Sequence, residues 1–264
     1  MRFDIFTLFP EYFDGPFSSS VLKRAIDAGA ISIGLHNMRD WCEDKHRRAD
    51  DAPFGGGAGM VLKADPVARA LESVLNFDVG SKPPCPIIYL SPQGRTLNQK
   101  IVLELAAHER IALLCGHYEG IDERAIQSCV TDEISLGDFV LTGGESAAAI
   151  VVESVSRFVP GVLGNEASAS GDSFSNGMLE APCYTRPATW REMDVPEVLL
   201  SGHHGEIEKW RFREGLRRTM LRRPELVEIA MRELPFSRAQ LKIYAELQRE
   251  IKEIHDESGH PSPG

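Results

Sequence analysis

The sequence predicts an α/β fold: a mainly parallel sheet with helices on both faces, followed by a small all-helical domain. Two apolar runs, residues 111–115 and 131–135, each lead directly into a glycine-containing loop, and a helix-length segment, residues 121–128, separates them. That arrangement indicates a parallel βαβ unit. Strand-like and helix-like segments alternate around it as far as residue 158. In such a unit both loops leave the carboxyl ends of neighbouring strands, where open α/β sheets bind their ligands.

Local signals place the other elements of the sheet. Further strands are expected at residues 2–8, 31–36 and 87–90, and further helices at residues 18–28, 65–75, 98–107 and 146–158. The first of these helices has a serine N-cap and ends at Gly29, as helices often do. Residues 37–60 form a long polar segment that contains FGGGAG. Unstructured connections of this length are usually functional, although a plain surface loop would look the same.

A change of composition predicts a second domain. Residues 164–177 (GNEASASGDSFSNG) are almost all small or polar, as in a flexible linker. Beyond them, Pro224 suits a first helical position, and Ser237 with Gln240 has the pattern of a capping box. We therefore expect an α/β ligand-binding domain over residues 1–163, a flexible linker over 164–177, a helical domain over 178–250 and a partly disordered tail over 251–264.

The overall composition is typical of a globular protein of the cytoplasm. Hydrophobic residues make up 42% and charged residues 26% of the chain, and no apolar run approaches a membrane span. The start, MRFDIFTLFP, is interrupted by Arg2 and Asp4 and indicates a strand rather than a signal peptide. The five cysteines are scattered and include no C-x-x-C pair, so they suggest neither a zinc site nor a disulfide framework.

Charge is unevenly distributed along the chain. The net charge of −10 argues mildly against a nucleic-acid partner. However, residues 209–223 (KWRFREGLRRTMLRR), here called the basic cluster, contain seven Lys or Arg residues and one acid, and residues 45–48 (KHRR) form a smaller basic run. Trp210 and Phe212 interleave with the charges of the basic cluster, which favours RNA binding. The alternative for both segments is a solvated surface.

The loops that follow residues 115 and 135 suit a ligand without phosphate. Their glycines let a ligand approach the backbone, and their charged side chains are mostly acidic: Glu119, Asp122, Glu123, Asp138 and Glu145 against Arg124. Neither a Walker loop nor the three-glycine dinucleotide fingerprint occurs in the chain. S-adenosylmethionine, with a nucleoside, an ammonium and a sulfonium group, fits this description. An ordinary βαβ unit with glycine turns and solvated acids would look similar.

Longer motifs make the chain similar to a known family. GHYEGIDER (residues 116–124) and SLGDFVLTGGE (135–145) resemble the cofactor motifs of the bacterial tRNA (guanine-N(1))-methyltransferases, which belong to the knotted SPOUT class. Further matches are YLSPQGR (89–95), DDAPFGGGAGM (50–60), RFVPGVLG (157–164), DSF (172–174), YTRP (184–187), GHH (202–204) and RRPEL (222–226). The resemblance spans nearly the whole chain. It implies a trefoil knot in the part that carries the cofactor loops, whereas unknotted connections are the general rule.

The resemblance implies a reaction and its site residues. The reaction is methyl transfer from S-adenosylmethionine to N(1) of the guanine 3′ of the anticodon, position 37 of tRNA. Asp172 matches the family's general base, and Arg157 matches the arginine that stabilises the guanine oxyanion or orients the aspartate. The implied cofactor-binding residues are Tyr89, Leu90, Ser91, Pro92, Gly116, Tyr118, Glu119, Leu136, Gly137, Asp138, Phe139, Val140, Leu141, Gly143 and Gly144. The implied tRNA-binding residues are Asp51, Gly57, Gly59, Lys209, Arg217, Arg218 and Arg222.

The resemblance further implies a homodimer with shared active sites and a magnesium ion, for which no carboxylate cluster in the sequence identifies a site. Without the resemblance, Asp172 would be interpreted as an ordinary turn residue and Arg157 as a cation at a helix end. The chain departs from the usual pattern at Leu136 and Phe139, where Ile and Tyr are common, and at Phe212, which interrupts a run that is often more basic. Two other functions stay open: a non-catalytic RNA-binding protein that senses a ligand, and a ribose or uridine methyltransferase of the same class.

Overall fold

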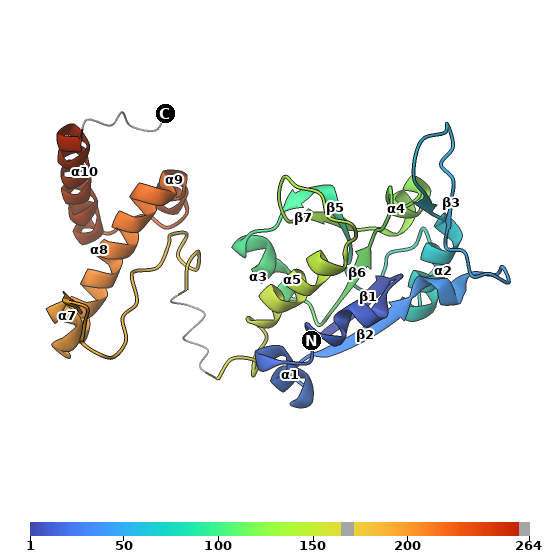
Figure 1. The fold of residues 1–264 in the computed structure, drawn as a ribbon, viewed down its shortest axis with the longest axis horizontal. Helices are drawn as coiled ribbons and strands as arrows, with labels where there is room; N and C mark the ends of the chain where they lie inside the picture. Colours follow the sequence, from blue (N-terminus) through green and yellow to red (C-terminus); the bar gives the residue numbers. More distant parts are fainter. Residues whose placement is uncertain (165–171, 259–264) are drawn as a thin grey trace. The chain divides into compact units, whose positions relative to one another are not determined.

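The computed structural model describes residues 1–164 and 172–258 and consists of two compact units, Met1–Glu166 and Ala167–Gly264 (Figure 1). Residues 165–171, half of the predicted linker, lie outside the described residues, as do residues 259–264 of the predicted tail. Within the described ranges, no helix is both long and apolar enough to cross a membrane.

A five-stranded sheet in the order β2-β1-β6-β5-β7 forms the centre of the first unit. Its strands are β1 (Arg2–Thr7), β2 (Ser32–Asn37), β5 (Ile87–Thr96), β6 (Arg110–Cys115) and β7 (Asp132–Ser135). All neighbouring strands are parallel, so the prediction of a mainly parallel α/β sheet is confirmed. The prediction that β6 and β7 are adjacent strands is wrong, because β5 lies between them. Buried parallel strands are all continuous apolar runs, which carry no information on their order.

Helices cover both faces of this sheet. They are α1 (Ser20–Asp27), α2 (Ala64–Leu75), α3 (Gln99–Ala106), α4 (Glu123–Cys129) and α5 (Glu145–Ser156). Between them run the 3₁₀ turns η1 (Pro10–Asp14) and η2 (Met38–Trp41) and a two-stranded ribbon of β3 (Asp50–Asp51) and β4 (Val61–Leu62). The side chains of each strand alternate between the two faces, so each face has its own core.

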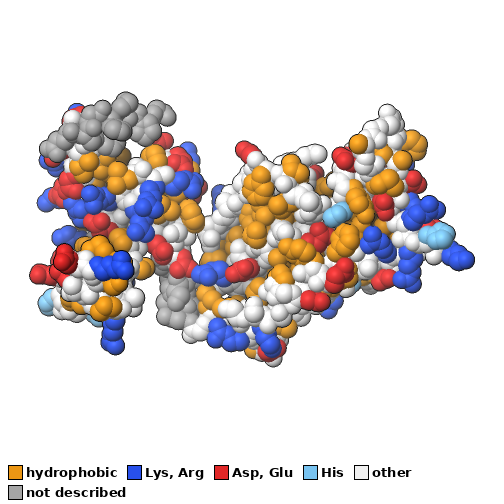
Figure 2. Space-filling model, in the orientation of Figure 1, with side chains coloured by type: hydrophobic (Ala, Val, Ile, Leu, Met, Phe, Trp, Pro, Cys, Tyr) orange, Lys and Arg blue, Asp and Glu red, His pale blue; other side chains and the backbone are white. Residues whose placement is uncertain are grey.

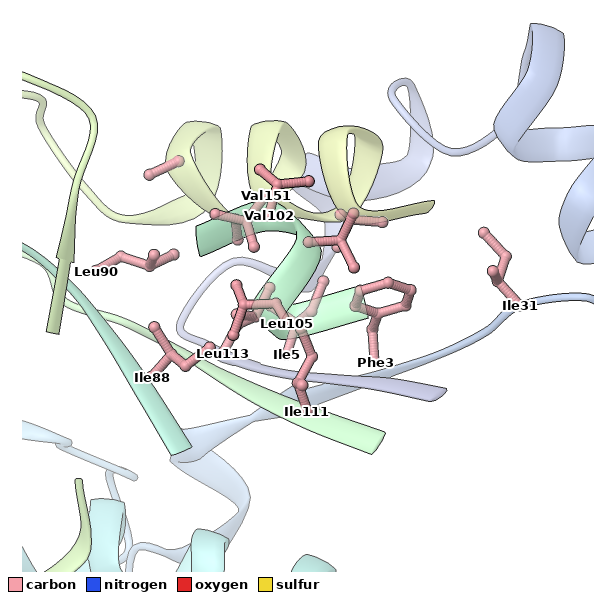
Figure 3. Close-up of a cluster of buried hydrophobic side chains, with 14 of the residues drawn as sticks. Phe3, Ile5, Ile31, Ile88, Leu90, Val102, Leu105, Ile111, Leu113 and Val151 are labelled. Carbon is pink, nitrogen blue, oxygen red and sulfur yellow. The ribbon is translucent and has the colours of Figure 1, made fainter. Parts of the chain in front are cut away.

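One core packs α1, α3 and α5 against the sheet. Figure 3 shows Val151 of α5 and Val102 of α3 lying over Ile5 and Leu113 of the central strands. The opposite core packs α2 and α4 against the alternate residues of the same strands, which include Phe6, Ile87, Tyr89, Ala112 and Leu114. Because both faces are buried, the carboxyl edge of the sheet is held rigidly from two sides.

A buried carboxylate fixes the opposite, amino-terminal edge. Asp4 of β1 is fully buried and is bound by Arg2, by His36 of β2 and by Arg110 of β6, at 2.9, 2.8 and 2.7 Å. Burial alone would raise the pKa of Asp4, but the hydrogen bonds from His36, Arg2 and Arg110 hold this pKa well below its usual range. Asp4 therefore stays ionised at neutral pH and ties three adjacent strands together.

The second unit is mainly helical, with α7 (Glu197–Leu200), α8 (His204–Arg222), α9 (Pro224–Glu233) and α10 (Arg238–Ser258). Its core contains Met178, Leu216, Val227, Ala230, Ile243 and Leu247. Pro224 is the first residue of α9, as predicted. The predicted capping box is confirmed, because the Ser237 backbone N–H donates to Gln240 at 2.9 Å and the Gln240 N–H donates to Ser237 Oγ at 3.3 Å.

A short hairpin corrects the prediction that residues 178–250 are all-helical. Thr189–Trp190 (β8) pairs antiparallel with Met193–Asp194 (β9). The turn residues Arg191 and Glu192 have φ values of +50° and +65°. Hairpin turns with two positive φ angles normally carry Asn or Gly, so Arg-Glu gives no sequence signal of a turn.

Candidate active site

Three loops at the carboxyl edge of the sheet enclose a cavity of about 310 Å³. They leave β5, β6 and β7, and comprise residues 91–94, 116–120 and 136–144. The N-terminal end of α5 completes the wall with Gly144 and Ala147. Cavities of this size bind nucleoside-sized ligands.

The first loop is an excursion within β5. Leu90 and Arg95 both pair with Ile134 of β7, so the intervening residues leave the sheet and then rejoin it. Ser91, Pro92 and Gln93 reach the cavity in this way. A Cβ atom on Gly94 would lie 2.3 Å from the Glu133 carbonyl carbon, so only glycine allows the chain to pass this close to β7.

The second and third loops are joined to each other. The Gly144 backbone N–H donates to the Gly116 carbonyl at 2.9 Å, and His117 forms a β-bridge with Gly143. A Cβ atom on Gly144 would lie 2.8 Å from Cys115 Cα. The contact is therefore backbone against backbone, and it brings two segments that are distant in sequence to the same wall of the cavity.

Tyr118 has a strained backbone at the cavity wall, with φ at +58°. A bulky aromatic residue rarely adopts this left-handed conformation, and such outliers concentrate at functional sites. Tyr89, from β5, is largely buried beneath the same loop. Burial raises the pKa of the Tyr89 hydroxyl, which is therefore protonated and uncharged at neutral pH.

Electrostatically, the cavity suits a cation rather than a phosphate. Among the described residues that line it there is no Lys or Arg, and Glu119 contributes an exposed carboxylate. Behind the wall, Glu145 is buried and accepts a hydrogen bond from Thr7 Oγ1 at 2.7 Å. Burial, and then the charge of Glu145, raise the pKa of the Cys115 thiol far above its usual value, so this cysteine is unreactive.

Thirteen of the fifteen predicted cofactor-binding residues line this cavity. Gly137 and Asp138 do not. Gly137 turns back onto the end of β7, where its N–H donates to Ser135 Oγ at 3.1 Å, and Asp138 next to it is exposed. Sequence reasoning missed seven lining residues: Gln93, His117, Gly120, Ile134, Ser135, Thr142 and Ala147. His117 and Gly120 lay inside the GHYEGIDER motif, so the motif itself was the available signal.

An apolar rim surrounds the mouth of the cavity. Tyr118, Phe139, Val140 and Leu141 have 45%, 55%, 84% and 42% of their surface exposed. Figure 2 shows hydrophobic side chains gathered on the visible face of the first unit. Contiguous apolar surface of this kind marks a binding surface.

Arg157 lies far from the cavity of its own chain. It caps the C-terminal end of α5, whereas Gly144 caps the N-terminal end at the cavity. The twelve residues of α5 separate the two by about 18 Å, at 1.5 Å per residue. The structure therefore does not bring Arg157 to the cavity within one chain.

Asp172 belongs to a turn of the second unit. Its carbonyl accepts hydrogen bonds from the Ser175 N–H and hydroxyl at 3.2 and 2.8 Å, and Met178, just beyond, is buried in the core of that unit. The end of the predicted linker is thus held by the second unit.

The segment that contains Asp51, Gly57 and Gly59 contacts the wall of the cavity. Asp51 lies in β3, and the glycine-rich loop, residues 54–59, connects β3 to β4. The Glu119 N–H donates to the Met60 carbonyl at 3.0 Å, and a Cβ atom on Gly59 would lie 2.4 Å from Glu119 Oε1. The base of the glycine-rich loop therefore touches a cavity-lining residue.

The basic cluster lies on α8 and is only partly available to a ligand. Lys209 and Arg222 are exposed, and Lys209 lies 3.9 Å from the exposed carboxylate of Glu206. Arg217 and Arg218 are half-buried: Arg217 lies 3.9 Å from Glu214, and Arg218 donates to the Glu180 carbonyl at 3.3 Å. Lys209 and Arg222 are accordingly the clearest of the predicted tRNA contacts.

Comparison with known proteins identifies the family. The family model for tRNA (Guanine-1)-methyltransferase TrmD matches residues 1–229. Proteins named tRNA (guanine-N(1)-)-methyltransferase are similar over almost their whole length: one from Dehalococcoides mccartyi is 52% identical over 95% of this chain and 98% of its own, and one from Chloroflexus aggregans is 54% identical over 93% and 95%. A relative from Geobacter sp. (strain M21) is 51% identical over 96% of this chain and 98% of its own. These matches show that the chain belongs to the tRNA (guanine-1)-methyltransferase TrmD family.

Proposed function

We propose that this protein transfers the methyl group of S-adenosylmethionine to N(1) of the guanine 3′ of the anticodon, position 37 of tRNA. The observation that carries the proposal is the cavity: it is enclosed by the three loops that hold the family's cofactor motifs, and no Lys or Arg lies among its described lining residues. Its relatives carry the name of this activity over nearly the full length of the chain. Because the proposed substrate is tRNA, we expect the reaction to take place in the cytoplasm.

The lining residues fit S-adenosylmethionine group by group. Gly116, Leu141 and Gly143 of the second and third loops line the cavity, and their backbone groups would bind the adenine and ribose. Leu136 and Phe139 supply an apolar wall for the base. Among the described lining residues Glu119 alone carries a carboxylate, and it would bind the methionine ammonium. The bound cofactor supplies an electrophilic methyl group.

The reaction needs a base and a positive charge at the guanine. N(1) of neutral guanine carries a proton, so its lone pair becomes nucleophilic only when that proton leaves. The Asp172 carboxylate would accept the proton, and the freed N(1) lone pair would then take the methyl group that S-adenosylmethionine supplies, with S-adenosylhomocysteine as the leaving group. Arg157 stabilises the negative charge that develops on O6.

The described side chains show no cluster of metal ligands. Within residues 1–164 and 172–258, no group of three or more His, Cys, Asp or Glu side chains could hold a metal ion. The described side chains therefore do not by themselves form a site for the magnesium ion that the family implies.

Two chains would have to combine to complete the active site. Arg157 lies about the length of α5 from the cavity of its own chain, and the rim of that cavity is apolar and exposed. A homodimer in which Arg157 and Asp172 serve the partner's cavity accounts for both observations. A trefoil knot is supported by the path of the chain, because β7 lies beyond β5 and the chain then returns to β6 at Gly144.

The shared site predicts complementation between two inactive variants. A Gly144→Val chain cannot form the cavity, and an Asp172→Ala chain lacks the base. Mixed dimers purified with two different tags should regain up to about half of the wild-type activity, because one of their two sites combines the intact halves. Activity is measured with saturating S-adenosylmethionine and tRNA. Well-folded mixed dimers that stay inactive would place base and cavity in the same chain, and a monomer in sedimentation would contradict the dimer itself.

The basic cluster predicts a salt-dependent contribution to tRNA binding. Lys209→Glu and Arg222→Glu should each weaken binding and lower the slope of log affinity against log salt by about 0.9 for each lost contact with a duplex phosphate. Binding of S-adenosylmethionine should not change. Filter binding at several salt concentrations measures the slope, and an unchanged slope would show that α8 presents a solvated face.

Turnover tests the proposed function against a non-catalytic RNA-binding protein. Purified protein should transfer radiolabelled methyl groups from S-adenosylmethionine to an unmodified tRNA transcript that carries guanine 3′ of the anticodon. A transcript with adenine at that position is the matched control and should accept no label. Binding of the transcript without any transfer would refute the enzyme.

A further inference from the structure

We propose that Phe54 is a stacking platform for an unpaired base of the RNA substrate that lies beside the target guanine. The proposal rests on the proposed function, because it requires an RNA whose target base enters the cavity described above. It starts from the exposure of Phe54, which at 99% is the highest among the large hydrophobic side chains in the described part of the chain. The ring contacts almost nothing in the chain itself.

The local backbone holds the ring away from the protein. Gly55, Gly56 and Gly57 follow Phe54 with φ values of +86°, +78° and +125°, and apart from the adjacent residues no heavy atom lies within 4 Å of the positions where their Cβ atoms would be. Conformations of this kind are readily open only to glycine. Three consecutive glycines therefore present Phe54 at the tip of a loop surrounded by open space, which leaves room for a flat ligand against the ring.

The position of the loop relates this ring to the cavity. Gly59, at the base of the loop, lies against Glu119, which lines the cavity. The Leu62 N–H donates to the Gly120 carbonyl at 2.9 Å and fixes the chain just beyond. Phe54 is five residues from Gly59, so the two are at most about 18 Å apart even in an extended chain. A base that neighbours the target guanine is within this reach.

The surroundings supply positive charge for the backbone of that RNA. Residues 45–48 (KHRR) precede β3 and are all exposed. Figure 2 shows Lys, Arg and His side chains gathered at the end of the first unit that carries β3 in Figure 1. Arg47 and Arg48 bind Asp40 and Asp44 at 3.1 and 3.4 Å. Exposed ion pairs contribute little stability, so a phosphate can replace either carboxylate.

An unpaired RNA base is the occupant that these features favour. Single-stranded loops are recognised when their bases splay out and stack on aromatic side chains, while cations hold the phosphates. An exposed aromatic ring next to a basic run and close to the cavity has this combination. The ring makes no hydrogen bond, so the stacking should tolerate any of the four bases.

Three substitutions separate aromatic stacking from simple apolar contact. Phe54→Ala should weaken binding of an unmodified tRNA transcript about 5- to 150-fold, the range for the loss of one base–aromatic stack. Phe54→Leu should be nearly as weak, because it keeps an apolar side chain but no aromatic face, and Phe54→Trp should bind at least as tightly as the wild type. Leu103→Ala, at another exposed apolar residue on α3, is the control and should not change binding.

Two further measurements use the full-length variants. The transcript carries 2-aminopurine on either side of the target guanine, and its fluorescence should be quenched at one of the two positions by the wild type but not by Phe54→Ala.

The salt dependence of tRNA binding should be the same in Phe54→Ala as in the wild type, because stacking releases no counterions, whereas Lys45→Glu should lower it.

The outcomes are distinct. Normal tRNA affinity in Phe54→Ala, or full affinity in Phe54→Leu, would overturn the proposal, and so would a change of oligomeric state in Phe54→Ala, which would make the ring a protein contact. If the Phe54 variants behave as expected but no 1-methylguanosine forms, the proposed function fails, and the stacked base can no longer be placed beside a target guanine, although Phe54 still contacts RNA. If 1-methylguanosine forms and Phe54→Ala binds normally, only the stacking proposal fails.

Discussion

Asp172→Asn is expected to lower the single-turnover rate of methyl transfer by a factor of about 10²–10⁴. The amide cannot accept the N(1) proton, so the guanine lone pair is not released, whereas the shape of the side chain is kept. Affinities for S-adenosylmethionine and tRNA should therefore stay close to those of the wild type, because the change acts on the transition state alone. Rapid-quench measurement with enzyme in excess over tRNA gives the rate.

A matched substitution controls for this effect. Asp27→Asn removes an exposed carboxylate of α1 that pairs with Lys23 of the preceding turn, and it should leave the rate unchanged. An Asp172→Asn enzyme with a near-normal single-turnover rate would show that another group removes the proton.

Gly144→Val is expected to abolish binding of S-adenosylmethionine. A Cβ atom at this position would lie 2.8 Å from Cys115 Cα and 3.2 Å from the Gly116 nitrogen. Both are backbone atoms, so the clash cannot be relieved by rotating a side chain, and the second and third loops must separate. Since these loops form two walls of the cavity, the site is lost while the cores on either side of the sheet persist.

Calorimetric titration with S-adenosylmethionine measures this loss. Thermal unfolding of Gly144→Val should stay cooperative, which separates a damaged site from an unfolded protein. Gly15→Ala is the matched control, because nothing lies within 4 Å of its Cβ position, and it should bind the cofactor normally. Normal binding by a folded Gly144→Val variant would mean that the cofactor lies elsewhere.

The five strands of the central sheet and the helices that cover it could be predicted because their apolar runs are clearly bounded, whereas the short β3–β4 ribbon in the polar segment could not. The order of the strands could not, since β5, β6 and β7 are alike in composition and differ only in their partners. The β8–β9 hairpin escaped prediction for a different reason: Arg191 and Glu192 adopt left-handed angles without the residues that normally announce them.

Motifs predicted most of the cavity wall, and contacts across the sequence explain what they missed. The Thr7 hydroxyl donates to Glu145, which is 138 positions away in the sequence. This contact supports α5 at the cavity, but neither segment has a local sequence pattern that predicts it. The motif predicted Gly144 as a cofactor-binding residue, and the contact of its backbone with Cys115 gives the physical reason. The roles of Asp172 and Arg157 stay predictions, because they depend on how two chains combine.

Mapping of the methylated nucleoside tests the proposed function most directly. An unmodified tRNA transcript with guanine 3′ of the anticodon is incubated with the wild-type protein and S-adenosylmethionine, digested to nucleosides and to oligonucleotides, and analysed by mass spectrometry. We expect 1-methylguanosine in stoichiometric amount, located only at the nucleotide 3′ of the anticodon. A ribose-methylated nucleoside, a methylated uridine, or 1-methylguanosine at another position would contradict it.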